Sequence, residues 1–330
     1  MKNNTITLKS RPVGMPDFSN FEFIEEPMPQ HGIGEILLKT VYVSVDPYLR
    51  GKMSGTKAPR FELNKPIASK IIAEVIKSDN KKVIEGDFVS GYLDWKEYQV
   101  SNGTEIQKVN AETAPLSAYL GVLGIIGLSA YFALSNIGKP KPGETLVVSA
   151  AAGAVGSIVG QIGKIMGCRV VGIVGTDEKA ALIKTKFGFD AAINYKTRPD
   201  IKTAVEEICP DGVDIYFDNV GGVISDGVIA NINKYGRIPV CGSVSNYNDI
   251  EEPTSPSLLP VVVYKFLSIQ GFLISDLAER FPEGISQLAF WLKEGKLKYS
   301  ETIVEGFDKL PEAFIGLLQG KNIGKMIVKI

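Results

Sequence analysis

The stretch SAAAGAVGSIVGQIGK, Ser149 to Lys164, decides how the fold of this 330-residue chain is interpreted. An apolar run, ETLVV, precedes it, and its glycines and alanines are typical of a loop that leads from a strand into a helix. Aligned with the pattern G-x-G-x-x-G, its key positions are Ala151, Gly153 and Gly156. Gly153 would let the backbone approach a pyrophosphate, and Gly156 would let the helix pack closely on the strand. The stretch predicts a dinucleotide site; the alternative is a Gly/Ala-rich helix packed tightly on a sheet.

Short apolar strands alternate with helices from Gly143 onward. The expected strands are ETLVVSA, RVVGIVG, AAINY, VDIYFDNV and GRIPVCG, and helices are expected over 153–167, over 177–187 and in DIKTAVEEIC. This alternation predicts an α/β fold with a doubly wound parallel sheet. A long amphipathic helix, FPEGISQLAFWLKEGKL, follows, and then a strand, a helix and a strand that we expect to return to the first domain.

The first third of the chain has the pattern of a β domain. Val41, Val43 and Val45 alternate with Tyr42 and Ser44, and ASKIIAEVIKS and DFVSGYLDW are short β-rich runs. A helical period of useful length is not apparent before about residue 115, so we expect an antiparallel, barrel-like domain. The Pro-rich segment EEPTSPSLLP, residues 251–260, is predicted to be a loop.

Composition narrows the class of protein. Apolar residues make up 45% of the chain and charged residues 22%, and the net charge of −1 argues against nucleic acid as the main partner. The N-terminal sequence lacks the apolar run of a secretory signal, and glycines interrupt the apolar stretch 116–134, so we expect no membrane span. Cys168, Cys209 and Cys241 are far apart, as expected of reduced thiols in a cytoplasmic protein.

The end of the second predicted strand indicates which dinucleotide is bound. An NAD-binding fold usually has an acidic residue there that bonds the ribose 2′-hydroxyl, but this chain has Gly175. A glycine leaves room for a 2′-phosphate, and Lys179 follows within a helical turn to pair with it. Asp177 and Glu178 fall in the first turn of the next helix, where the helix dipole favours acids. The pattern favours NADPH over NADH. The alternative for Lys179 is that it is an ordinary solvated lysine on a helix and does not contact the 2′-phosphate.

Several motifs carry a family likeness. The segments AAAGAVGSIVGQIGK, VGTDEKAALIKTKFGFDAAINYK, YFDNVGG and GRIPVCGSVSNYN, with VSVDPYLRGKM and the last 39 residues, closely resemble the zinc-free medium-chain dehydrogenases/reductases. Among these the chain resembles the prostaglandin reductase / leukotriene B4 dehydrogenase group of NADPH-dependent alkenal/one reductases. The resemblance implies a GroES-like β-barrel domain (1–118, with a C-terminal return over 296–330), a Rossmann domain (119–295) and a cleft between them.

The resemblance also implies an activity and a cofactor site. It implies a homodimer that uses NADPH to reduce a C=C bond conjugated to a carbonyl, with hydride transfer to the β-carbon of an enone or enal. Lys179 and Tyr195 would hold the 2′-phosphate, and the loop 55–70 would help to shape the substrate pocket. Taken singly, Tyr195 could be an ordinary strand-end tyrosine and Asn219 a turn former. The other cofactor contacts that the resemblance implies are Ala152, Gly153, Ala154, Val155, Gly175, Asn219, Cys241, Gly242, Ser243, Tyr247, Phe272, Leu273, Ile274 and Asn322.

A reduction without metal needs hydrogen-bond donors at the carbonyl oxygen, where negative charge develops. Tyr264, in PVVVYKF, is the leading candidate because relatives carry a tyrosine there, and a core aromatic is the alternative. Tyr48 could also contact substrate, and the ribose 2′-hydroxyl is a further donor. Arg50 could line the cleft or brace the domain through Asp46. We expect the α-carbon proton to come from solvent.

Other chemistries are disfavoured by the residues present. The single histidine, His31, and the scattered cysteines do not supply a set of zinc ligands, so we expect no metal. Cys241 is better explained as a small buried residue than as a nucleophile. Two rival functions stay open: an NADPH:quinone oxidoreductase, and an NADPH-binding sensor or structural protein without turnover.

Overall fold

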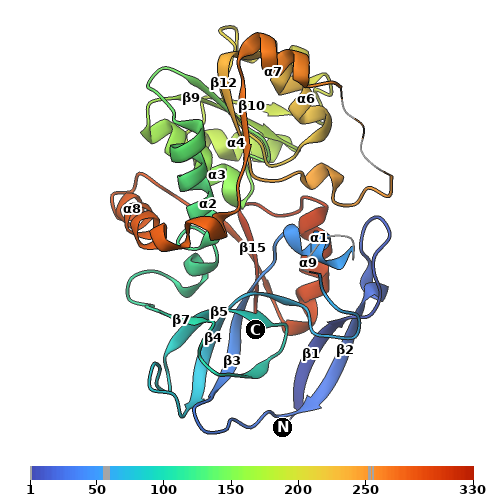
Figure 1. Cartoon of the computed structure of the whole chain (residues 1–330), viewed down its shortest axis with the longest axis vertical. Coiled ribbons are helices and arrows are strands. Elements are labelled where there is room, and N and C mark those ends of the chain that lie inside the picture. Colours follow the sequence, from blue (N-terminus) through green and yellow to red (C-terminus); the bar gives the residue numbers. More distant parts are fainter. Residues whose placement is uncertain (1, 55–59, 252–253, 255) are drawn as a thin grey trace. The chain divides into compact units, whose positions relative to one another are not determined.

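The computed structural model describes residues 2–54, 60–251, 254 and 256–330 (Figure 1). Part of the predicted loop 55–70 and part of the Pro-rich segment 251–260 lie outside the described residues. The chain forms two compact units. Unit 1 comprises Met1–Gly121 and Glu301–Ile330, and unit 2 comprises Val122–Ser300.

Unit 2 is built on a parallel sheet. Within the described residues six strands pair in the order β10-β9-β8-β11-β12-β13, and every pairing is parallel. This is the dinucleotide-binding strand order, with the topological switch point between β8 and β11. The order confirms the predicted doubly wound sheet. The strands are β8 (Thr145–Val148), β9 (Arg169–Val174), β10 (Ala191–Asn194), β11 (Val213–Phe217), β12 (Ile232–Val240) and β13 (Ser268–Gly271).

Helices connect these strands and cover the sheet (Figure 1). All four residues of β8 are buried, as expected of a parallel strand covered on both faces. The helix α2 packs on α3 and α8 packs on α2, whereas α5 packs on α6. The helices are α2 (Ile125–Ala133), α3 (Ala154–Ile165), α4 (Asp177–Thr185), α5 (Ile201–Ile208), α6 (Gly222–Ala230), α7 (Leu259–Lys265) and α8 (Phe281–Lys293), with short turns η3 (Leu134–Gly138), η4 (Val244–Asn246) and η5 (Ile274–Arg280).

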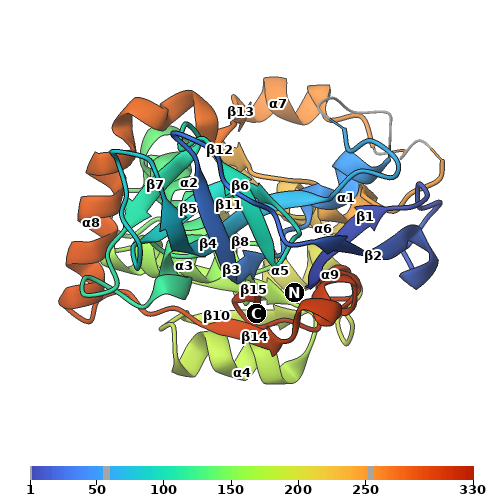
Figure 2. The ribbon, with the colours of Figure 1, turned by 90° about the horizontal axis from the view of Figure 1, so that it is seen from below.

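Unit 1 is mainly antiparallel, as the sequence predicts. Among the described residues its larger sheet has the order β14-β15-β3-β4-β5-β7, with β6 also paired to β3, and β1 pairs separately with β2 (Figure 2). The strands are β1 (Lys2–Leu8), β2 (Phe21–Pro27), β3 (Ile36–Ser44), β4 (Ala68–Ser78), β5 (Phe88–Asp94), β6 (Tyr98–Ser101), β7 (Ile106–Val109), β14 (Glu301–Glu305) and β15 (Lys325–Lys329). Short helical turns η1 (Phe18–Asn20), η2 (Leu116–Leu120) and η6 (Phe307–Lys309) join them.

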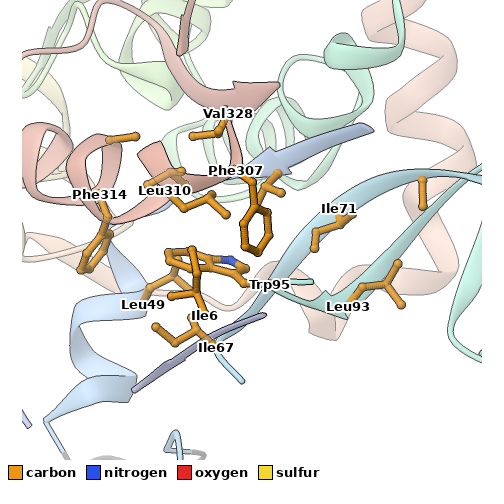
Figure 3. Packing of buried hydrophobic residues seen from close by; sticks show 14 of the residues in the cluster. Ile6, Leu49, Ile67, Ile71, Leu93, Trp95, Phe307, Leu310, Phe314 and Val328 are labelled. Carbon is orange, nitrogen blue, oxygen red and sulfur yellow. The ribbon is translucent and has the colours of Figure 1, made fainter. Parts of the chain in front are cut away.

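The core of unit 1 combines both ends of the chain. Trp95 is fully buried, and its indole nitrogen donates to the Ser69 hydroxyl at 2.9 Å. Figure 3 shows Ile6 from β1 and Phe314 from α9 (Leu310–Leu318) in the same cluster. Strand β15 pairs antiparallel with β3. The C-terminal strand–helix–strand therefore packs into the N-terminal unit because its apolar face completes that core.

One helix in unit 1 was missed at the sequence level. The structure has α1 (Tyr48–Met53), although no helix was expected before about residue 115. Its six residues are too short to show a helical period, and Pro47 occupies the N-cap. None of the helices in the described residues is long and apolar enough to cross a membrane.

Candidate active site

The glycine loop lies at the carboxyl end of β8. Gly153 is the N-cap of α3 and offers no side chain to the free N–H groups of the first turn. Ala150 takes the left-handed conformation (φ 49°), and its carbonyl accepts a hydrogen bond from the Gly153 N–H at 2.9 Å. A Cβ at Gly156 would lie 2.4 Å from the Ala150 oxygen, so only glycine allows this close packing. The loop therefore presents uncapped N–H groups that fit a phosphate.

A second group of residues surrounds Gly175, at the end of β9. A Cβ at Gly175 would lie 3.0 Å from the Tyr195 hydroxyl oxygen, so this ring lies against the glycine. The half-buried Lys179 in α4 has its pKa lowered by burial and by the ammonium of Lys196. Two cations held near each other favour an anion between them, and a hydroxyl adds a further donor. This arrangement fits the 2′-phosphate of NADPH.

One of the two acidic residues near this group, Asp177, is already engaged. Asp177 accepts a hydrogen bond from the Asn194 amide at 2.8 Å, and the Thr176 hydroxyl caps α4 by accepting from the Lys179 N–H at 3.2 Å. Asp177 and Glu178 lie in the first turn of α4, as predicted. Their position is explained by the helix dipole.

Polar contacts join β8 to β11 at the switch point. The Asn219 amide donates to the Ser149 carbonyl at 2.8 Å, and the Asn219 N–H donates to the Ser149 hydroxyl at 2.9 Å. The buried Asp218 accepts from the Tyr216 hydroxyl at 2.9 Å and from the Ser225 hydroxyl at 2.5 Å. Asn219 is therefore more than a turn former, because its side chain ties together the two loops that flank the switch point.

The segment after β12 forms another wall at this edge of the sheet. The N–H groups of Cys241 and Gly242 both donate to the Asp218 carbonyl, at 2.7 and 3.3 Å. The Ser243 hydroxyl donates to the side-chain amide oxygen of Asn246 at 2.5 Å, and Gly242 leaves room for the Tyr247 hydroxyl. Burial and Asp218 raise the pKa of the Cys241 thiol to about 12. Cys241 is therefore a neutral thiol, which argues against the nucleophile alternative.

The remaining predicted contacts are divided between the units. Phe272, Leu273 and Ile274 follow the carboxyl end of β13. Asn322 belongs to unit 1, where its buried amide donates to the Gly324 carbonyl at 2.7 Å. Tyr48 also belongs to unit 1. Unit 2 thus gathers all predicted cofactor residues except Asn322 after the carboxyl ends of its strands.

The surroundings of Tyr48 are defined within unit 1. Burial, Asp46 and Tyr92 raise the pKa of the Tyr48 hydroxyl, so it stays protonated and able to donate. Lys52 donates to the Tyr92 hydroxyl at 2.5 Å and lies 5.6 Å from the centre of the Tyr48 ring. Tyr92 and Lys52 were not singled out from the sequence.

Among the described residues, Asp46 does not form the expected ion pair with Arg50. Asp46 pairs with the buried ammonium of Lys325 at 3.2 Å. Arg50 donates to the backbone carbonyls of Pro12 and Gly14 at 3.3 and 2.8 Å. These contacts give Arg50 a bracing role through the N-terminal segment.

Tyr264 lies on α7, and 81% of its surface is exposed. The alternative of a core aromatic is therefore wrong. A run of β-branched residues suggested burial, but these residues form a short helix, of which Val263 is also 66% exposed. The hydroxyl of Tyr264 is available to a ligand or a partner.

Two residues near the predicted cofactor site were missed in the sequence. Lys196 directly follows Tyr195 at a strand end, and that adjacency was the available signal. Asp218 precedes Asn219 in the segment YFDNVGG and organises the loop after β11. In the described part of the chain, no group of three or more His, Cys, Asp or Glu side chains is placed to hold a metal ion.

Two family models match the chain. Residues 4–109 match the N-terminal domain of oxidoreductase, and residues 154–290 match zinc-binding dehydrogenase. The chain is 44% identical to prostaglandin reductase 1 of Bos taurus, which covers 98% of both chains. It is 41% identical to NADPH-dependent curcumin reductase of Escherichia coli K12 (100% and 97% covered) and 39% identical to the NADP(+)-dependent 2-alkenal reductase of Nicotiana tabacum (100% and 98%).

The same similarity is found among solved structures. The structure of CurA from Vibrio vulnificus in complex with NADPH matches with a TM-score of 0.94 and 41% identity, over 99% of this chain and 98% of that one. The chain therefore belongs to the medium-chain dehydrogenases/reductases, in the prostaglandin reductase, curcumin reductase and alkenal reductase group. It is an NADPH-dependent oxidoreductase, as the sequence predicts.

Proposed function

We propose that the protein reduces the C=C bond of α,β-unsaturated ketones and aldehydes with NADPH and without zinc. The observation that carries this proposal is the similarity, over nearly the whole chain, to enzymes named as curcumin, prostaglandin and 2-alkenal reductases. Curcumin and 2-alkenals share a C=C bond conjugated to a carbonyl, which defines the substrate class.

The residues of unit 2 would hold the cofactor. The uncapped first turn of α3 would receive the pyrophosphate. Lys179, Tyr195 and Lys196 would receive the 2′-phosphate, and Asn219 would help to position the rest of the dinucleotide. NADPH, when bound, supplies the hydride for the reduction. The other residues in this role are Ala152, Gly153, Ala154, Val155, Gly175, Cys241, Gly242, Ser243, Tyr247, Phe272, Leu273, Ile274 and Asn322.

The side chains that act on the substrate must stabilise the negative charge that forms during the reduction. When the β-carbon is reduced, negative charge develops on the carbonyl oxygen, and a hydroxyl donor placed there lowers the barrier. Tyr264 has an exposed hydroxyl, and Tyr48 has a hydroxyl that its surroundings keep protonated. We assign Tyr264 as the main donor and Tyr48 as the second, and solvent as the source of the α-carbon proton.

A pair of steady-state assays tests the substrate class. The purified protein should oxidise NADPH in the presence of a 2-alkenal or a conjugated ketone and release the saturated carbonyl compound. Turnover of quinones alone would instead assign a quinone oxidoreductase. NADPH binding without turnover of any enone, enal or quinone would assign a non-catalytic role.

Zinc independence is tested by removing metal. We expect activity to survive extended dialysis against a chelator, because the donors assigned to the carbonyl oxygen are hydroxyl groups. The purified protein should contain no stoichiometric zinc by elemental analysis. A tightly bound zinc whose removal abolishes turnover would contradict this mechanism.

The exposed edge of unit 2 supports a homodimer. Strand β13 ends the described sheet and is paired only with β12 within it. Exposed apolar side chains lie on β13 and its neighbours, and such an edge favours pairing with a second copy. We expect light scattering to give twice the mass of one chain, and Ile269→Lys to give the single mass. A monomer at assay concentrations would contradict this assembly. The exposed residues are Leu259, Val263, Phe266, Ile269 and Leu273.

A further inference from the structure

A pocket of about 550 Å³ lies at the amino ends of strands in unit 2, opposite the edge that carries the predicted cofactor residues. We call it the amino-end pocket. Neither the proposed reaction nor the cofactor site uses it. It is lined by Asn136, Ile137, Lys139, Lys141, Glu144, Asp214, Lys234, Tyr235, Arg237, Ser268 and Gln270.

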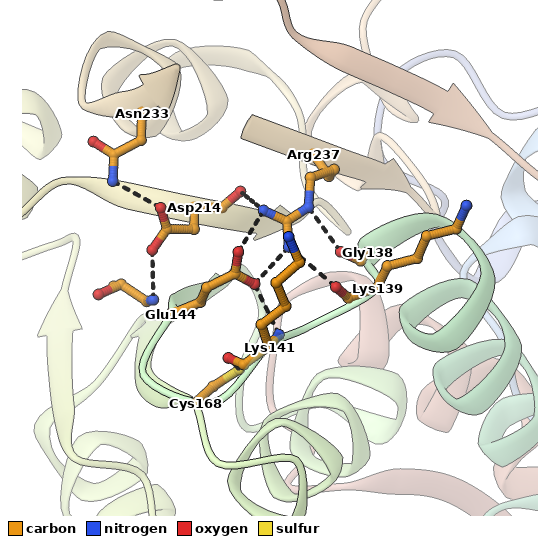
Figure 4. Close-up of polar contacts among 9 residues, drawn as sticks. Gly138, Lys139, Lys141, Glu144, Cys168, Asp214, Asn233 and Arg237 are labelled. Carbon is orange, nitrogen blue, oxygen red and sulfur yellow. Dashed lines mark hydrogen bonds and ion pairs between the residues drawn. The ribbon is translucent and has the colours of Figure 1, made fainter. Parts of the chain in front are cut away.

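An ion pair forms the frame of the amino-end pocket (Figure 4). Both carboxylate oxygens of Glu144 accept from Arg237, at 2.9 and 2.5 Å. Arg237 also donates to the Lys139 carbonyl at 3.2 Å, and Glu144 accepts from the Lys141 N–H at 2.9 Å. The pair therefore fixes the backbone of two lysines. Because its charges neutralise each other, Arg237 adds little net charge to the pocket.

Three lysines leave the pocket with an excess of positive charge. The other lining carboxylate, Asp214, accepts from the Thr145 N–H and the Asn233 amide, at 2.8 and 2.9 Å. Within the described part of the chain, no carboxylate lies within 4 Å of the ammonium of Lys139, Lys141 or Lys234. Lys234 instead lies over aromatic rings, 4.7 Å from the centre of Phe266.

The backbone around the amino-end pocket is irregular at several points. The turn η3 is π-helical, and its C-cap, Lys139, takes the left-handed conformation (φ 45°). The register between β11 and β12 shifts between Val213 and Ile215, and the extra residues of β12 include Lys234 and Tyr235 (φ 66°). Such bulges, π turns and left-handed residues cost free energy and gather at functional sites.

We propose that the amino-end pocket binds a small polyanion, a soluble compound that carries two or more phosphate groups. Its volume suits a small molecule, and lysines bind phosphate as point charges. Lys139, Lys141 and Lys234 all line the pocket, and their summed charge exceeds what a monovalent anion requires. Ser268 and Gln270 supply uncharged polar groups on the same wall.

Calorimetric titration with inorganic pyrophosphate tests the proposal without turnover. The protein is first saturated with NADPH, so that the phosphate sites at the carboxyl edge are occupied. We expect one pyrophosphate per chain, with affinity that falls as salt is added. The triple variant Lys139→Gln/Lys141→Gln/Lys234→Gln should bind at least about tenfold more weakly, because it loses several charge-assisted contacts.

A matched triple variant distinguishes binding at the amino-end pocket from a general effect of the positive charge of the protein. Lys184, Lys202 and Lys293 are exposed lysines of unit 2 outside the pocket, and changing all three to Gln removes the same charge. This variant should bind pyrophosphate as the parent does. Equal weakening in both triples, absence of binding, or binding that NADPH abolishes would each overturn the proposal.

Lys139→Gly provides a test that does not depend on the triple variant folding. Glycine adopts the left-handed conformation without strain, so this variant should melt at a higher temperature than the parent. It should nevertheless bind pyrophosphate severalfold more weakly. Unchanged binding in the stabilised variant would contradict a role for Lys139 in the pocket.

Discussion

Replacing Tyr264 by Phe is expected to lower kcat by about 10²–10³, the usual cost of removing one donor to a developing oxyanion. The KM for the enone should change less, because the ring and its apolar contacts are retained. The exposed position of the hydroxyl predicts little change in thermal stability. Steady-state kinetics and a melting curve on the same preparation measure both effects.

The control for this prediction is Tyr235→Phe. Tyr235 is also an exposed tyrosine of unit 2, but it lines the amino-end pocket. Removing its hydroxyl in the variant Tyr235→Phe should leave kcat unchanged. If Tyr264→Phe retains full kcat with NADPH binding intact, Tyr264 has no part in the chemistry. The main donor would then be sought in Tyr48, through the variant Tyr48→Phe.

Replacing Lys179 by Ala is expected to raise the KM for NADPH about ten- to hundredfold, as loss of a charge-assisted contact to a phosphate does. Use of NADH, which lacks the 2′-phosphate, should be almost unaffected. The ratio of kcat/KM for the two cofactors is therefore the measurement. Lys196→Ala should shift the ratio in the same direction, because the ammonium of Lys196 lies close enough to lower the pKa of Lys179 and would act on the same phosphate.

Lys184→Ala serves as the control for Lys179→Ala. Lys184 is exposed and lies in the last turn of the same helix, α4. The variant Lys184→Ala should leave the ratio of kcat/KM for NADPH and NADH unchanged. Equal loss of activity with NADPH and NADH in Lys179→Ala would mean that Lys179 supports the fold instead of the 2′-phosphate.

Much of the fold of unit 2 could be predicted because its elements have local causes. Continuous apolar runs predicted the parallel strands, and Gly153 and Gly156 indicated where α3 begins. The helix α1 could not be predicted, because six residues after a proline carry too little periodicity. Tyr264 illustrates a similar limit: the β-branched run before it resembles a buried strand but forms an exposed helix.

The candidate site was predictable where its residues follow strand ends. Gly175 and Tyr195 come directly after a parallel strand, and Asn219 lies two residues after the end of another, so the sheet brings them to one edge. The amino-end pocket had no such signal. Lys139 and Lys234 are far apart in the sequence, and the pairing of the strands, the contacts of Arg237 and the bulge of β12 bring the surrounding segments together.

The most direct test of the central claim is the fate of deuterium from labelled NADPH. The protein is incubated with a conjugated enone and NADPH that carries deuterium at the reactive carbon of the nicotinamide, and the product is examined by NMR. We expect a saturated ketone with deuterium on the carbon that was β to the carbonyl. An allylic alcohol with deuterium on the former carbonyl carbon, or no transfer to any enone, would contradict the account.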